Sequence, residues 1–268
     1  MSTLPITKKL RSIWISDAHL GTKDCRADYL LHFLNSVDAD NLYLVGDILD
    51  LEKITSSPLY WPDDQHKVVK TIFAKAQNGT NTVYIPGNHD SPFRDYVGHN
   101  FNKISIEKEY IHTTADNRRF LVSHGDEFDI LLKPGYLSHL VGHHGYNLLM
   151  ALSRVLQRLR GRFGYHDYWS LTAYIKQNIK KARLYIEKFE KAALQEAKRR
   201  RLDGYICGHI HRPGIRHSHG VTYCNTGDWV ENCSALVEHT DGQMEVLYWA
   251  GVMSRLLVAA KTQTTRAA

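Results

Sequence analysis

The chain has 268 residues, of which 43% are hydrophobic and 23% are charged, with a net charge of +6; these values are ordinary for a globular protein and suit one large α/β domain, with or without an insertion. No segment reaches the roughly 18 uninterrupted apolar residues of a membrane span, and the run Lys8–Arg11 enters the first predicted strand so early that no signal peptide is expected. The four cysteines have no Cys-x-x-Cys spacing, and a reducing cytosol is therefore the expected compartment.

The first half of the chain predicts alternating strands and helices. The second predicted helix carries apolar residues at helical spacing and ends at Asn78-Gly79, which is a helix stop signal. A short irregular stretch is expected after Asp90. The strands expected in this half are Ser12–Ser16, Leu42–Val45, Thr82–Ile85, Lys103–Ile106, Tyr110–Thr113 and Arg119–Ser123, and the helices lie near Asp28–Ser36 and Asp64–Asn78.

The composition changes between Phe128 and Arg201, where the chain is rich in helix formers. Residues 154–201 hold fourteen Lys and Arg against four Asp and Glu, a local charge of +10, so the rest of the chain carries −4. The part before residue 160 is rich in leucine. These features predict an apolar, cationic helical cap, although a solvated helix end is the better interpretation of Lys198–Arg201, because the helix dipole favours basic side chains there.

The last part of the chain again predicts strands. They are expected at Gly204–Cys207, Gly214–His217, Val221–Asn225, Ser234–Glu238 and Gln243–Trp249. Residues 251–268 are expected to form either a poorly ordered end or a short amphipathic contact. Periodicity by itself indicates a mixed α/β fold and no more.

Five polar motifs follow the ends of predicted strands, where each strand continues into a loop at the edge of the sheet. They are Asp17-Ala18-His19, Gly46-Asp47-Ile48-Leu49-Asp50, Gly87-Asn88-His89-Asp90, Ser123-His124-Gly125-Asp126 and Gly208-His209-Ile210-His211. Imidazole and carboxylate ligands suit divalent Mn, Fe or Zn. The seven candidate donors are Asp17, His19, Asp47, Asn88, His124, His209 and His211.

Seven donors are too many for one ion, so two ions sharing a bridging carboxylate fit better. Two metals roughly 3.5–4 Å apart clamp the attacking and leaving oxygens of a displacement at phosphorus, and a bridging water would supply hydroxide. A lone Asp-x-His is mostly accidental, and Gly-Asp is usually a turn signal. The ordered occurrence of all five motifs favours a binuclear phosphoester hydrolase.

The motif order D-x-H, GD-x-x-D, GNH[DE], H and GH-x-H resembles the calcineurin-like metallophosphoesterase superfamily over residues 11–249. The resemblance implies a four-layer α/β/β/α sandwich with a helical cap insertion. Its core would comprise residues 1–127 and 202–250, the insertion residues 128–201, and the tail residues 251–268.

The same resemblance implies a role for each motif residue. One metal would be held by Asp17, His19 and His211, and the other by Asn88, His124 and His209, with Asp47 bridging them. His89 would donate a proton to the leaving oxygen or stabilise the transition state, because a positioned imidazole has a pKa near the working pH. Asp90 would orient its ring.

Within the superfamily, the chain is most similar to the UDP-2,3-diacylglucosamine hydrolase (diphosphatase) group. The similarity lies in the motif order, the helical insertion between the motifs of His124 and His209, and the segment 224–229. It implies cleavage of a nucleotide-linked lipid to UMP and 2,3-diacylglucosamine 1-phosphate in lipid A synthesis, with two Mn²⁺ ions. Asn178 and Lys181 match an Asn-x-x-Lys pair that meets substrate in that group.

The similarity also implies work at the cytoplasmic face of the inner membrane, to which a basic cap would be drawn by anionic lipid. Two departures leave another nucleotide or nucleic-acid phosphodiester open as substrate. Hydrolases of that group usually carry Arg at the position of His89, and the segment Leu51–Thr55 matches no substrate contact. Nucleic acid is the less favoured partner, because the positive charge lies on Leu-rich helices. The native metal and the oligomeric state stay open.

Overall fold

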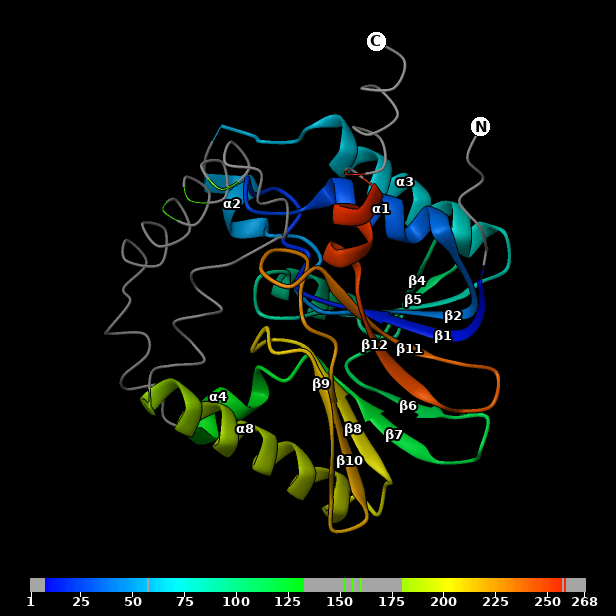
Figure 1. Ribbon diagram of the computed structural model, residues 1–268, viewed down its shortest axis with the longest axis vertical. Coiled ribbons are helices and arrows are strands. Elements are labelled where there is room, and N and C mark those ends of the chain that lie inside the picture. Colours follow the sequence, from blue (N-terminus) through cyan, green and yellow to red (C-terminus); the bar gives the residue numbers. More distant parts are fainter. Residues whose placement is uncertain are drawn as a thin grey trace.

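The computed structural model describes residues 8–56, 58–132 and 180–256, together with residues 152, 156, 160 and 258. Within these residues the chain forms two β-sheets stacked face to face, with helices on the outer face of each (Figure 1). The predicted α/β/β/α sandwich is thereby confirmed. In the part of the chain that is described, no helix is both long and apolar enough to cross a membrane.

The first sheet has seven strands in the order β12-β11-β1-β2-β3-β5-β4. Strands β1, β2, β3 and β5 run parallel to one another, whereas β4, β11 and β12 pair antiparallel. Parallel strands are covered on both faces, which is why they read as apolar runs in the sequence. The bounds are β1 Lys8–Ile15, β2 Val37–Val45, β3 Asn81–Ile85, β4 Asn100–Phe101, β5 Ile104–Ile106, β11 Ser234–Glu238 and β12 Met244–Tyr248.

Helices α1 (Ala27–Ser36) and α3 (Asp63–Gln77) cover the outer face of this sheet. Each buries an apolar stripe at a spacing of three or four residues, as an amphipathic surface helix does. Residues 249–256 are also helical, and Trp249 packs edge-on against Phe33 of α1 at 5.1 Å between ring centroids. Met253, at the start of the predicted tail, is partly buried and packs against the same core.

The second sheet has five strands in the order β6-β7-β8-β10-β9. Its outer face is covered by α8 (Lys180–Arg199), whose buried residues include Ile186, Phe189, Ala193 and Ala197. The prediction assigned this helix to the insertion, but it packs on β8 and β10. The other bounds are β6 Tyr110–Thr113, β7 Arg119–Val122, α4 Glu127–Leu132, β8 Gly204–Cys207, β9 Gly214–Ser218 and β10 Val221–Asn225.

A third apolar cluster fills the space between the sheets and includes Trp14, Tyr43, Phe120, Ile206 and Leu236. All eleven predicted strands are present, with ends that differ by a few residues. The prediction missed the two-residue strand β4, which is too short for a period to register, and α2 (Leu51–Ser56). The Asp50 carboxylate caps α2 by accepting a hydrogen bond from the Lys53 backbone at 3.0 Å.

Candidate metal centre

The five polar motifs meet at one edge of the sandwich, where strands β1, β2, β3, β7 and β8 end. Backbone hydrogen bonds continue between the loops beyond the strands. The Asp17 N–H donates to Gly46 O at 3.0 Å, the His19 N–H to Asp47 O at 2.9 Å, and the Gly208 N–H to His124 O at 3.1 Å. These bonds hold the first two motifs side by side, and the last two motifs likewise.

Many of the predicted ligands have a left-handed backbone. Non-glycine residues with positive φ are uncommon and store strain that the surrounding structure must hold, often at functional sites. Such residues here include Asp17 (51°), His19 (48°), Asp47 (53°), His209 (66°) and His211 (53°). Five predicted ligands in this conformation indicate that the loops are shaped to aim these side chains.

The first group of donors comprises Asp17, His19 and His211, whose ligand atoms all lie within 4.8 Å of one another. Asp17 is fully buried, and Nε2 of His211 lies 3.1 Å from its Oδ1. Burial raises the pKa of Asp17, but the approach of His211 and the other nearby imidazoles outweighs it and lowers the pKa to about 2. The carboxylate is therefore ionised at neutral pH and available as a ligand.

The second group comprises Asp47, His124 and His209, again within 4.8 Å. Nε2 of His124 lies 3.3 Å from Oδ2 of Asp47. Burial raises the pKa of Asp47, but the neighbouring His124 outweighs it and holds the pKa below its ordinary value. Asp47 also accepts the backbone N–H of His89 on Oδ1 at 2.8 Å, so its two oxygens face different motifs.

Outer hydrogen bonds fix the two imidazoles of this second group. The Nδ1–H of His124 donates to the Val45 carbonyl at 2.9 Å, and Nε2 of His209 lies 2.9 Å from Oδ2 of Asp129 in α4. In metal sites the second nitrogen of a ligating histidine is usually held in this way, which sets the tautomer and the orientation of the ring. His124 thus presents Nε2 to the centre, and His209 presents Nδ1.

The two groups are in direct contact. The backbone N–H of His209 donates to Oδ2 of Asp17 at 3.0 Å, which ties the second group to the first. Two glycines make the close packing of these loops possible. A Cβ on Gly208 would collide with the Asp17 carboxylate, and a Cβ on Gly87 would collide with Asp47 and with the His124 ring. Glycine is therefore required at both positions by close packing.

The residues present fit a pair of divalent ions. Oδ1 of Asp17 and Nε2 of His124 are buried and make no hydrogen bond with any described residue, although Nε2 of His211 and Oδ2 of Asp47 lie 3.1 and 3.3 Å from them. Burial of unsatisfied polar atoms is costly, and coordination of a cation would remove that cost. Mixed nitrogen and oxygen donors suit Mn, Fe or Zn.

A third group surrounds His89, which is half-buried. Oδ2 of Asp50 lies 3.3 Å from Nδ1 of His89 and 3.5 Å from Nδ1 of His19. The carboxylate that faces the His89 ring is therefore Asp50, not Asp90 as the resemblance implied. Sequence reasoning gave Asp50 no role, although its spacing within Gly-Asp-x-x-Asp was a usable signal.

Asp90 instead holds the loops together. Its oxygens accept the N–H of Gly87 at 2.6 Å, the N–H of Ile48 at 2.8 Å and the hydroxyl of Tyr84. These bonds connect the motif after β3 to the motif after β2. A fully buried carboxylate with such partners organises the backbone on which Asp47 and His89 are carried.

The structure thus brings together six of the seven predicted donors: Asp17, His19 and His211 in one group, and Asp47, His124 and His209 in the other. Asn88 is exposed and lies between Gly87, which touches Asp47, and His89, so its ligand role stays a prediction. Asn178 lies outside the described residues. Lys181 lies in α8, but its side chain is outside the description.

Comparison with known proteins gives one family. The profile described as calcineurin-like phosphoesterase matches residues 10–213. No curated protein matches the chain.

Solved structures with a similar arrangement are distant. A predicted phosphoesterase from Streptococcus pneumoniae TIGR4 is 12% identical, covering 89% of this chain and 97% of its own, with a TM-score of 0.36. Yfce, a phosphoesterase from E. coli, is 15% identical over 88% and 98%, with a TM-score of 0.41. Zn²⁺-bound Vps29 from Entamoeba histolytica is 10% identical over 89% and 98%, with a TM-score of 0.41.

Proposed function

Because the chain belongs to the calcineurin-like phosphoesterase family, it is a metal-dependent phosphoester hydrolase, and we propose that it hydrolyses the pyrophosphate of UDP-2,3-diacylglucosamine. The products would be UMP and 2,3-diacylglucosamine 1-phosphate. The hydrolytic part of this proposal is carried by one observation: two groups of three metal donors lie next to each other, joined by the hydrogen bond from the His209 backbone N–H to Asp17.

In such a centre the metal ions and the protein side chains have different chemical roles. When bound, two divalent ions would supply a nucleophile at neutral pH and would neutralise charge on the phosphoryl oxygens. Asp47, with its two oxygens directed to different motifs, is the residue placed to serve both ions. The identity of the ions is proposed as Mn²⁺, with Fe and Zn suiting the same donors.

His89 is the residue proposed to act on the leaving group. Its ring is partly accessible, with one third of the side chain exposed, and its Nδ1 faces Asp50 at 3.3 Å. An imidazole held by a carboxylate in this way can give up a proton from its other nitrogen to a departing oxygen. Asp50 is thus the positioning residue for His89, and Asp90 supports the loop beneath it.

The lipid part of the proposal is supported by the sequence between the motifs of His124 and His209. This segment is rich in leucine in its first half and carries a local charge of +10 over residues 154–201. An apolar, cationic segment suits an anionic amphiphile, and clustered basic residues favour an anionic membrane surface by about 1 kcal/mol each. On this ground we propose that the enzyme works at the cytoplasmic face of a membrane.

A second candidate is hydrolysis of another nucleotide or nucleic-acid phosphodiester. It is favoured by His89, which stands where the diacylglucosamine hydrolases usually have Arg. An imidazole offers one hydrogen bond to a pyrophosphate, whereas Arg offers a planar fork of donors. This difference bears on the substrate and leaves the reaction class unchanged.

The deciding experiment offers the purified protein UDP-2,3-diacylglucosamine and bis(p-nitrophenyl) phosphate, each with Mn²⁺, Fe²⁺, Zn²⁺ or EDTA. Release of UMP that requires metal supports the lipid substrate. Cleavage of the aryl diester without any UMP would reject that substrate and retain the reaction class. Mixing the protein with vesicles that contain or lack anionic lipid, followed by sedimentation, tests the membrane contact separately.

A further inference from the structure

The outer face of the first sheet is unevenly covered. Parallel neighbours need a crossover connection, which is usually a helix packed on the sheet. The connection from β1 to β2 contains α1, and the connection from β2 to β3 contains α3. The connection from β3 to its parallel neighbour β5 contains only the 3₁₀ helix η1 (Ser91–Tyr96) and the short strand β4. The sheet beside α3 therefore lacks a full helical cover.

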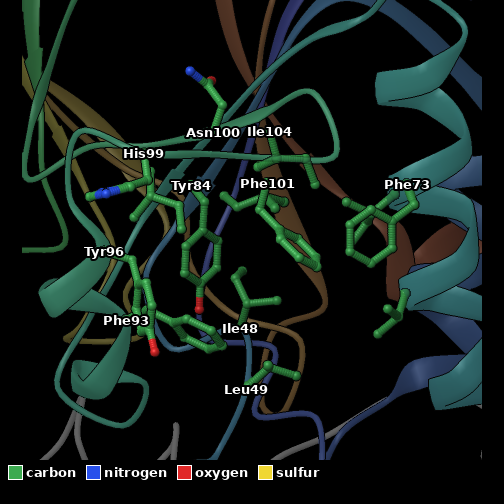
Figure 2. Close-up of a pocket in the computed structure, with 14 residues that line it drawn as sticks. Ile48, Leu49, Phe73, Tyr84, Phe93, Tyr96, His99, Asn100, Phe101 and Ile104 are labelled. Carbon is green, nitrogen blue, oxygen red and sulfur yellow. The ribbon is translucent and has the colours of Figure 1, made fainter.

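A cavity of about 590 Å³ occupies this position. Its floor includes Leu44, Tyr84 and Ile106, which are direct neighbours across β2, β3 and β5. Figure 2 shows Phe73 of α3 on one side of the pocket and Phe93 of η1 on the other. The volume lies within the range of roughly 300–1,000 Å³ that is typical of small-molecule sites.

The residues that line the pocket favour a hydrocarbon ligand. Of its fourteen residues, ten are aliphatic residues or Phe; the polar side chains are Tyr84, Tyr96, His99 and Asn100. The Tyr84 hydroxyl is already donated to Asp90. A sugar or a nucleobase would lose its hydrogen bonds to water there without adequate replacement, whereas an alkyl chain loses none.

The rim of the pocket carries two large aromatic side chains that are open to solvent, next to the exposed His99 and Asn100. Phe101 is 65% exposed and Tyr96 is 56% exposed; in Figure 2, Tyr96 lies on the same side as Phe93, and Phe101 lies between that side and Phe73. Large exposed aromatic side chains next to an apolar hollow are characteristic of a binding groove. This places the entrance between the β4–β5 hairpin and η1.

The pocket shares its wall with the metal centre. Ile48 and Leu49 line it, and they are the two residues between Asp47 and Asp50. Their backbone N–H groups donate to Oδ2 of Asp90 at 2.8 and 3.4 Å, the same carboxylate that receives the Tyr84 hydroxyl. A ligand in the pocket would therefore pack directly against the loop that carries the predicted bridging carboxylate.

We propose that this pocket binds a hydrocarbon chain of the substrate, an acyl chain whose phosphoester end is processed at the adjacent metal centre. This inference rests on the proposed function, because it requires a substrate that is a phosphoester and carries an apolar chain. It does not depend on the nucleotide, because it concerns the apolar chain alone.

Direct binding tests the pocket without turnover. Metal-free protein in EDTA is titrated with the fluorescent fatty acid cis-parinaric acid. Val69→Trp fills the pocket from α3, and Phe101→Glu places a charge on its rim at a largely exposed position. The control is Ile111→Trp, which introduces the same large residue at an exposed position of the second sheet.

We expect wild type and Ile111→Trp to bind the probe alike, and both pocket variants to bind at least about tenfold more weakly, since each buried methylene contributes about fourfold in affinity. Circular dichroism establishes that each variant is folded. Equal affinity of Phe101→Glu and wild type would overturn the proposal. A wild-type protein that does not bind the probe would overturn it as well, because the pocket would then not be open to a hydrocarbon chain.

A chain-length series separates this inference from the identity of the substrate. The p-nitrophenyl phosphodiesters of methanol and decanol are compared by kcat/KM in Mn²⁺. We expect the decyl ester to be favoured at least about tenfold in wild type and Ile111→Trp, with most of that ratio lost in Val69→Trp. If this holds while UDP-2,3-diacylglucosamine yields no UMP, the lipid nucleotide is wrong and the pocket stands. If UMP forms but the ratio is the same in Val69→Trp, the pocket is wrong and the substrate stands.

Discussion

Oδ2 of Asp129 lies 2.9 Å from Nε2 of His209, although the two residues are 80 positions apart in the sequence. Asp129 belongs to α4, and it also receives a hydrogen bond from the hydroxyl of Tyr185 in α8. The pair joins the helical layer outside the second sheet to the predicted metal centre. Carboxylates in this position orient ligating histidines and increase their basicity.

We therefore predict that Asp129→Ala weakens metal binding by about 10–100-fold, the usual effect of losing such a partner. Isothermal titration of the apoprotein with Mn²⁺ measures this change. Tyr185→Phe is the matched control, because it removes the other hydrogen bond of Asp129 and leaves the bond to His209. An equal loss in both variants would mean that Asp129 acts through general packing and not through His209.

Asp47→Ala should release metal and lower phosphodiesterase activity by more than about 100-fold, since even outer partners of a metal site account for about 10–100-fold. Asp40→Ala provides the comparison, because Asp40 is exposed and its ion pair with Lys9 at 3.4 Å contributes little. Metal content by mass spectrometry and hydrolysis of bis(p-nitrophenyl) phosphate are the two measurements. Retention of full activity by Asp47→Ala would reject a centre built on this carboxylate.

Gly87→Ala should disturb the centre, because the added methyl group would meet the Asp47 carboxylate and the His124 ring. Overpacking of this kind costs about 1–3 kcal/mol. Gly214→Ala adds the same methyl group where nothing lies within 4 Å, so its stability should equal or slightly exceed that of wild type. Urea unfolding and Mn²⁺ affinity of the two variants give the comparison, and equal behaviour would show that the loops yield without effect on the site.

Glu238 provides a test of how the two sheets are joined. Its buried carboxylate on β11 accepts from Ser12 at 2.8 Å and lies 2.9 Å from Nε2 of His112 on β6 of the other sheet. Burial raises the pKa of Glu238, but its hydrogen-bond partners outweigh it and hold the pKa below the ordinary 4.5. We expect Glu238→Gln to lower the free energy of unfolding near pH 7 by about 1–3 kcal/mol, because hydrogen bonds to a charged group are lost.

The sign of the pH dependence follows from that lowered pKa. The ionised form stabilises the folded state fully above the unfolded value of about 4.5, and the contribution is lost as the pH falls through the folded pKa. The difference between wild type and Glu238→Gln should therefore shrink below about pH 4.5. Glu245→Gln, at an exposed ion pair with His239, should change stability by less than about 0.5 kcal/mol at any of these pH values.

The sequence by itself determined most of the strands and the chemistry of the site. Runs such as Leu42–Val45 are apolar because parallel strands are covered on both faces, so their pattern is local and readable. The ligand types, and their positions directly after strand ends, are likewise properties of short segments. Six predicted donors from four motifs therefore fell into two groups, as expected from the shared edge of the strands.

Only the tertiary structure decided which side chains face one another. Asp50 faces His89, Asp129 holds His209, and Asp90 ties two loops together, and the local pattern does not show which carboxylate meets which partner. The apolar pocket arises because η1 replaces a crossover helix, which leaves the sheet uncovered beside α3. Periodicity reports which face of an element is buried, but a partner or a cavity depends on how distant elements pack, and the sequence does not contain that information at any one place.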